Sequence, residues 1–64
     1  MGHAFVIEVA GEAVGIVARD GRGFRFHAAL RAFRSLEGRV FRRPSDAALA
    51  ARALTRKPIE ARSR

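Results

Sequence analysis

The chain has 64 residues, no cysteine and a net charge of +7 at neutral pH. A chain of this length forms one small domain, and without cysteine it holds neither a disulfide nor a thiolate-bound metal. It contains no basic-then-apolar N-terminal signal and no apolar run of about 20 residues, so we expect no membrane association and a cytoplasmic location.

Basic residues are concentrated in the C-terminal two-thirds of the chain. Twelve of the thirteen are arginine, and residues 1–18 contain two glutamates but no lysine or arginine. Residues 19–64 hold all thirteen basic residues against four acidic ones, a net charge of +9. This layout suits a polyanionic partner such as nucleic acid. The arginine- and alanine-rich composition is also similar to that of short bacterial proteins from GC-rich genomes.

Residues 5–10 and 13–19 are predicted to form a β-hairpin. Both segments are rich in β-branched side chains, and Gly11-Glu12 has glycine at the first position of a two-residue type II′ turn. This turn pairs Ile7 with Ile16. The face predicted as core then carries Phe5, Ile7, Val9, Val14, Ile16 and Ala18, and the outer face carries Val6, Glu8, Ala10, Ala13, Gly15 and Val17.

A second turn within residues 20–23 leads to a third predicted strand, residues 24–28. The length of its loop matters because a change of one residue in register exchanges the two faces of a strand. A two-residue Asp20-Gly21 loop would turn the rings of Phe24 and Phe26 to the outer face.

A three-residue loop ending in glycine, either Arg19-Asp20-Gly21 or Gly21-Arg22-Gly23, has the opposite effect. It places both phenylalanine rings in the core and sends Arg25 and His27 outward. The shorter loop would bury Arg25, and an unpaired buried guanidinium costs on the order of several kcal/mol. We therefore predict a three-residue loop with both rings in the core.

The rest of the chain is predicted to be mainly helical. Apolar residues at helical spacing predict a short helix that ends near Gly38: Ala29, Ala32, Phe33 and Leu36. Residues 39–42 form an extended link or a short edge strand. A longer helix begins with Ser45 as its N-cap, has Asp46 in its first turn and ends at Pro58. Its inward stripe consists of Ala47, Ala50, Ala51 and Leu54.

These elements predict an α+β fold, in which a three-stranded antiparallel β-meander is packed by a C-terminal α-helix. Residues 1–58 form the domain. Residues 59–64 form a frayed basic tail.

The segment Arg22-Gly23-Phe24-x-Phe26 resembles the strand on which RNA-recognition-motif domains stack bases. That resemblance implies RNA binding by the two phenylalanines. The chain departs from the family's pattern at Arg25, His27 and Ala29, and two strands without an intervening helix precede the match. We therefore interpret the resemblance as coincidental and both phenylalanines as core residues.

A three-stranded sheet followed by a helix is also similar to the small DNA-binding domains of some plant transcription factors and of integrase N-termini. That resemblance implies an outer sheet face that reads the major groove. The predicted outer face carries arginines only near one end, and the chain has no asparagine or glutamine for adenine contacts. Sequence-specific DNA reading is therefore not expected.

Two surfaces are candidates for binding. The outer sheet face and the open strand edges form a predicted protein-interaction patch: Val6, Glu8, Ala13, Gly15 and Val17. An arginine cluster near the backbone N–H groups that follow Ser45 is the predicted phosphate or nucleic-acid contact: Arg39, Arg42, Arg43, Arg52 and Arg56.

Nothing in the sequence indicates catalysis. The two histidines, His3 and His27, have no carboxylates at metal-ligand spacing, and the hydroxyl side chains have no adjacent base. No glycine-rich phosphate loop occurs. We expect a protein that is not an enzyme and has no cofactor, metal or small-molecule substrate. Its expected function is binding to an unidentified protein or to itself, and the alternative is weak, sequence-independent nucleic-acid binding.

Overall fold

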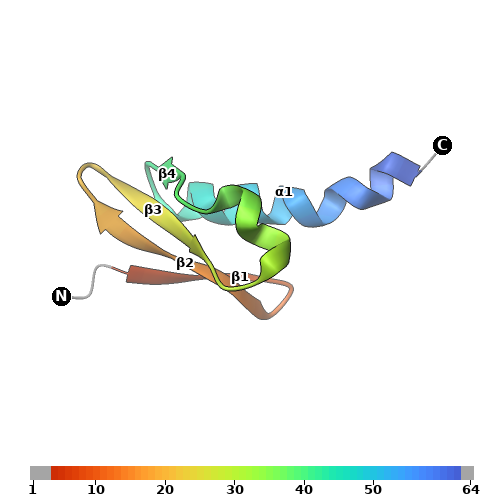
Figure 1. Cartoon of the computed structure of the whole chain (residues 1–64), viewed down its shortest axis with the longest axis horizontal. Coiled ribbons are helices and arrows are strands. Elements are labelled where there is room, and N and C mark those ends of the chain that lie inside the picture. Colours follow the sequence, from red (N-terminus) through yellow and green to blue (C-terminus); the bar gives the residue numbers. More distant parts are fainter. Residues whose placement is uncertain (1–3, 63–64) are drawn as a thin grey trace.

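The strands pair in one antiparallel sheet in the computed structural model, which describes residues 4–62, with side chains described through residue 55. The strand order is β1-β2-β3-β4, with bounds β1 Ala4–Val9, β2 Glu12–Asp20, β3 Gly23–Ala28 and β4 Val40–Phe41. The 3₁₀ helix η1 (Arg31–Leu36) connects β3 to β4, and α1 (Pro44–Arg62) follows β4 (Figure 1). The predicted α+β fold is confirmed, and the link after η1 adds the fourth strand.

The loop of the β1–β2 hairpin is Ala10-Gly11, one residue earlier than predicted. Both residues have positive φ, 53° and 79°, as a type I′ turn requires. The register shifts with the loop, so Ile7 lies opposite Gly15, and a β-bulge follows at the next position. The predicted register is wrong. Its physical reason lies in packing, since the ring of Phe26 occupies the space that a side chain at residue 15 would need.

The loop of the β2–β3 hairpin is shorter than predicted. It consists of Gly21-Arg22, and β2 pairs with β3 so that Val17 lies opposite Phe26. The prediction of a three-residue loop is wrong, although Phe26 does lie in the core, fully buried. Phe26 reaches the core despite the shorter loop because the residue opposite it, Val17, lies on the core face and not on the outer face as predicted.

The core lies between the sheet, η1 and the first half of α1. Its buried side chains come from all three: Ile7, Val14, Val17, Phe26, Phe33, Leu36, Ala47 and Ala51. The small alanine side chains let α1 lie close to the sheet, as the predicted stripe requires. Two backbone hydrogen bonds fasten the end of η1 to β3, because Gly38 N–H donates to Phe26 O and Phe26 N–H donates to Arg39 O, both at 2.9 Å.

Helix α1 begins at Pro44, so the prediction of Ser45 as its N-cap is wrong. Proline suits the first helical position because its φ is already helical and its missing N–H would have no partner there. Arg43 is the cap, and its carbonyl oxygen accepts hydrogen bonds from the N–H groups of Asp46 (3.0 Å) and Ala47 (3.4 Å).

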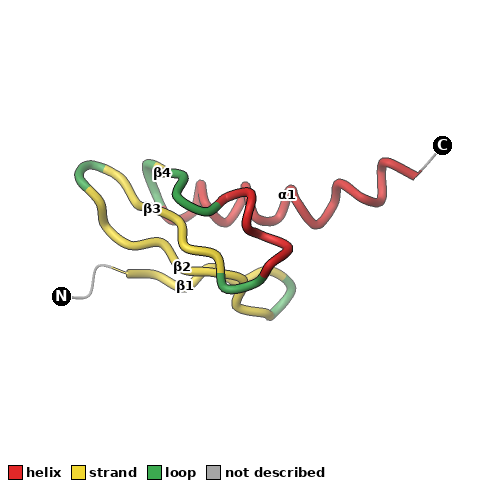
Figure 2. The backbone as a smooth tube through the Cα atoms, in the orientation of Figure 1, coloured by secondary structure: helices red, strands yellow, loops and turns green. Residues whose placement is uncertain are grey.

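The C-terminal end of α1 also differs from the prediction. A proline inside a helix removes one backbone hydrogen bond, but α1 passes through Pro58 and ends at Arg62. The helix extends past the sheet, and the molecule measures 46 × 20 × 18 Å (Figures 1 and 2). The division into a domain of residues 1–58 and a tail of residues 59–64 stays a prediction, and residues 63–64 lie outside the described part of the chain.

Candidate interaction surfaces

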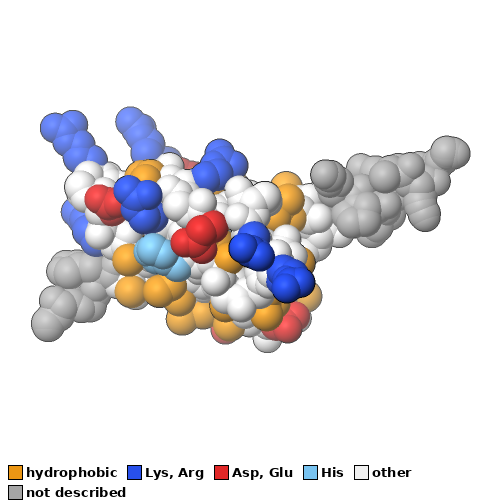
Figure 3. Space-filling view, viewed as in Figure 1, with side chains coloured by type: hydrophobic (Ala, Val, Ile, Leu, Met, Phe, Trp, Pro, Cys, Tyr) orange, Lys and Arg blue, Asp and Glu red, His pale blue; other side chains and the backbone are white. Residues whose placement is uncertain are grey.

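The sheet face opposite α1, called the outer face below, carries an apolar cluster next to strand β1. Val6 lies opposite Ile16, and their side chains are 59% and 39% exposed. Ala4 and Ala18 form the neighbouring pair. Figure 3 shows hydrophobic side chains gathered along the lower side of the molecule, below the histidine. Among the described residues, no element covers these side chains.

The predicted interaction patch does not exist as one surface. Val6, Glu8 and Ala13 are exposed, but Gly15 and Val17 are buried on the core face. The cause is the register of the first hairpin, since a shift of one residue reverses the faces of β2. Ile16, predicted as core, takes the exposed place beside Val6 for the same reason, and Phe5 is 46% exposed.

Polar contacts occupy the outer face on the side of β3. Arg25 Nε donates to Asp20 Oδ2 at 2.6 Å, and Arg25 Nη1 donates to the carbonyl oxygen of Gly38 at 2.9 Å. His27 Nδ1 lies 3.3 Å from Glu37 Oε2. The apolar part of the outer face therefore adjoins β1, whose far side has no strand partner among the described residues.

The predicted arginine cluster is spread over two parts of the molecule. Arg39, Arg42 and Arg43 flank β4 and the start of α1, and Arg52 lies further along the helix; all four are exposed. Arg43 is close to Asp46, with 4.0 Å between Nε and Oδ2. The side chain of Arg56 lies outside the described residues.

The β2–β3 turn places a further arginine, Arg22, beside β4. This placement was not predicted from the sequence. Arg22 and Arg42 line a hollow of about 180 Å³ together with Gly23, Val40 and Phe41. Gly23 allows this close approach, because a Cβ there would lie 2.6 Å from Val40 Cγ1 and 2.7 Å from Phe41 O. Arg22 and Arg42 lie near each other because β3 pairs with β4. Their spacing in the sequence therefore gives no indication that they share a hollow.

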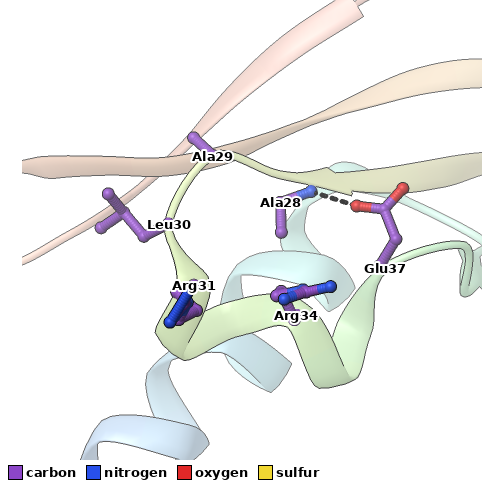
Figure 4. Close-up of a pocket in the computed structure, with 6 residues that line it drawn as sticks. All are labelled: Ala28, Ala29, Leu30, Arg31, Arg34 and Glu37. Atoms are coloured by element: carbon purple, nitrogen blue, oxygen red, sulfur yellow. Dashed lines mark hydrogen bonds between the residues drawn. The ribbon is translucent and has the colours of Figure 1, made fainter.

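A larger hollow, of about 420 Å³, lies beside η1 (Figure 4). Residues of a 3₁₀ helix that are three apart lie in one row, and Arg31 and Arg34 accordingly lie side by side along η1 (Figure 4). Glu37 follows in the same row, and its Oε1 accepts a hydrogen bond from Ala28 N–H at 2.7 Å. The carboxylate thus fastens η1 to the end of β3.

The hydrogen bond from Ala28 N–H lowers the pKa of Glu37 below its ordinary value of 4.5. Partial loss of hydration opposes this shift, and the neighbouring His27 and Arg34 lower the pKa further. A carboxylate with a lowered folded-state pKa stabilises the fold above its unfolded pKa, and this contribution is lost as the pH falls through the folded value.

Replacing Glu37 with glutamine is expected to remove this pH dependence. The wild type should have the higher melting temperature above pH 5, and the difference between the two proteins should shrink as the pH falls below about 4. Thermal unfolding followed by circular dichroism from pH 3 to pH 7 measures it. Glu12→Gln, which removes one negative charge from the β1–β2 hairpin, is the control. A difference between wild type and Glu37→Gln that stays constant with pH contradicts the assignment.

Within the described residues, no metal site adds to these surfaces. The described residues contain no group of three histidine or acidic side chains that could hold a metal ion. No helix in the described part of the chain has both the length and the hydropathy needed to cross a membrane. The chain matches no family model, no curated protein and no solved structure.

Proposed function

We propose that the protein is a non-catalytic module that associates with a second copy of itself through strand β1. The observation that carries this proposal is the exposed pair Val6 and Ile16 beside the edge of β1 that no other described strand occupies. A long, flat, apolar edge strand is a template for pairing with another chain unless charges, prolines or a covering element block it. Within β1, Glu8 is the one charged residue and proline is absent.

The small size of the core supports this reading. Within residues 4–55, eight side chains are buried, and two of them are alanines. Chains of about 60 residues bury a smaller share of their surface than larger domains, and association is one way in which they gain stability. No described residue covers the apolar side chains of the outer face, so contact with another chain would remove them from water.

The distribution of charge favours contact between two copies at the β1 edge over contact elsewhere on the surface. The molecule carries +7, and residues 19–64 account for all of the positive charge. Residues 4–18, which form β1 and most of β2, contain Glu8 and Glu12 and no basic residue. Two copies therefore meet with the least repulsion when their hairpins face each other.

Antiparallel pairing of β1 with β1 of the second copy would join two four-stranded sheets into one. The two outer faces would become continuous, and a register centred on Val6 would place the Val6 side chains of the two copies side by side. Ile16, opposite Val6 on β2, would extend the same apolar surface. An interface built from one six-residue strand and a few side chains is small, so dimerisation should depend on protein concentration.

The test is a pair of valine-to-lysine variants at opposite edges of the same face. Val6→Lys places a charge at the proposed interface, whereas Val40→Lys places it on β4, where valine is similarly exposed at 52%. We expect the wild type and Val40→Lys to dimerise with rising concentration and Val6→Lys to remain monomeric. Sedimentation velocity over a wide range of concentrations measures this.

Two results would overturn the proposal. One is a wild type that stays monomeric at every concentration, which would leave only a different protein as partner for this face. The other is an equal effect of Val6→Lys and Val40→Lys, which would show that added charge and not the β1 edge controls association.

A further inference from the structure

Aromatic and arginine side chains alternate at the end of the sheet near the β2–β3 turn. Phe24 lies between Arg19 on β2 and Phe41 on β4, its two cross-strand partners. The guanidinium carbon of Arg19 lies 5.3 Å from the centre of the Phe24 ring, and that of Arg39 lies 5.2 Å from the centre of the Phe41 ring. We call these residues, together with Phe5, the aromatic–arginine row.

Phe5 extends the row across to β1. Its ring meets that of Phe24 edge-on, with the centres 5.7 Å apart and an angle of 73° between the planes. The row is on the core face of the sheet, but the β2–β3 hairpin extends past the start of α1 (Figure 1). Phe26, two residues further along β3, is fully buried, whereas Phe24 and Phe41 are half-buried and Phe5 is exposed.

Positive charge at this end of the molecule has little internal compensation. Within the described residues, Arg19, Arg22, Arg39 and Arg42 take part in no ion pair. Asp20, which lies between Arg19 and Arg22 in the sequence, forms its ion pair with Arg25 on the outer face. Figure 3 shows several lysine or arginine side chains projecting from this end.

We propose that the aromatic–arginine row is a binding site for single-stranded nucleic acid. Aromatic rings and the planar guanidinium groups of arginine both stack on nucleobases, and arginine also attracts phosphate. In a double helix the base faces are already stacked on one another, so a duplex could offer this row only its phosphates. The single strand is therefore the expected ligand.

The hollow lined by Arg22 and Arg42 gives the phosphate backbone a place beside the row. It shares Phe41 with the row, so a strand whose bases lie on Phe24 and Phe41 would pass its phosphates between these two arginines. The chain has no asparagine or glutamine to read adenine edges. Binding should therefore tolerate any base sequence and weaken as salt concentration rises.

The experiment measures fluorescence anisotropy of a labelled oligouridine strand and of a labelled random duplex of equal length, at two salt concentrations. The double variant Arg19→Ala/Arg39→Ala should lose about tenfold or more in affinity for the single strand. Its matched control, Arg31→Ala/Arg34→Ala, removes the same charge from η1 and should lose less than about threefold. Circular dichroism checks that each variant is folded.

Two further variants separate stacking from charge. Arg19→Lys/Arg39→Lys keeps the net charge but removes the planar groups, and Phe5→Ala removes a ring without changing charge. Each should weaken binding of the single strand about fivefold. Unchanged binding in both variants would show that charge alone, without stacking, attracts the single strand to this end of the molecule.

Three results would overturn the proposal. The first is an absence of binding to the single strand at low salt. The second is equal affinity for strand and duplex. The third is an equal loss in the two double-alanine variants, which would mean diffuse attraction over the whole surface. Each of them is independent of the oligomeric state, so failure here leaves the proposed self-association standing.

Discussion

Replacing Phe26 with alanine is expected to lower the free energy of unfolding by about 3 to 5 kcal/mol, because Phe26 is fully buried and its loss leaves a cavity. A domain of 64 residues has a total stability of about 3 to 10 kcal/mol. The variant should therefore lose between about a third and all of the stability of the wild type. Urea unfolding followed by circular dichroism, at one low protein concentration, measures the difference.

Phe5→Ala is the matched control, because it removes the same side chain from an exposed position. Phe5 contacts Phe24 edge-on, and such aromatic pairs contribute about 0.5 to 1.5 kcal/mol beyond the area they bury. We expect a loss of about 1 kcal/mol and a cooperative transition. Equal losses for the two variants would contradict the packing described for Phe26.

The fold class could be predicted from the sequence, but the pairing of the strands could not. Strand β1 has apolar side chains on both faces, including Phe5 and Ile7 on one and Val6 on the other. An alternating pattern therefore does not decide which face is buried. The glycine of the first turn was identifiable, but not its place in the loop. The structure has Ala10 at positive φ before Gly11, a conformation that only the packing of the whole sheet selects.

The start of α1 is a second case in which two local signals compete. Ser45 is a good N-cap by type, and Pro44 is a good first helical residue. Both cannot hold at once, since a proline at the first helical position places the cap at Arg43. The helix itself could be predicted from its alanine-rich sequence and terminal signals, and the spacing of Ala47 and Ala51 indicated its buried face.

The candidate sites were only partly predictable for the same reason. The basic character of residues 19–64 is a property of composition. The approach of Arg19 to Phe24, and of Arg22 to Arg42, depends on which residues lie opposite each other across the strands. Because the register of the first hairpin differs from the prediction, Ile16 and not Val17 is the exposed apolar residue of β2 on the outer face.

The second large effect is expected at Gly15, which is buried on β2 beneath the Phe26 ring. A Cβ at residue 15 would lie 2.7 Å from Phe26 Cζ and 2.7 Å from the carbonyl oxygen of His27. A ring can shift, but the strand backbone cannot move without breaking its pairing. Gly15→Ala should therefore destabilise the protein by about 1 to 3 kcal/mol, although alanine is otherwise the better strand residue.

A double-mutant cycle with Phe26→Leu separates the two contacts at Gly15. Leucine lacks the outer ring atoms, so Gly15→Ala should cost less in that background, by at least about 0.5 kcal/mol. The remaining cost comes from the His27 carbonyl oxygen, which no change at residue 26 removes. Ala13→Val, at an exposed position of the same strand, should change stability by less than about 0.5 kcal/mol. If Gly15→Ala instead stabilised the protein, β2 and β3 could not pair with residue 15 beneath the Phe26 ring. The register that turns Val17 inward and Ile16 outward would then be wrong, and the proposed β1 interface would lose its apolar face.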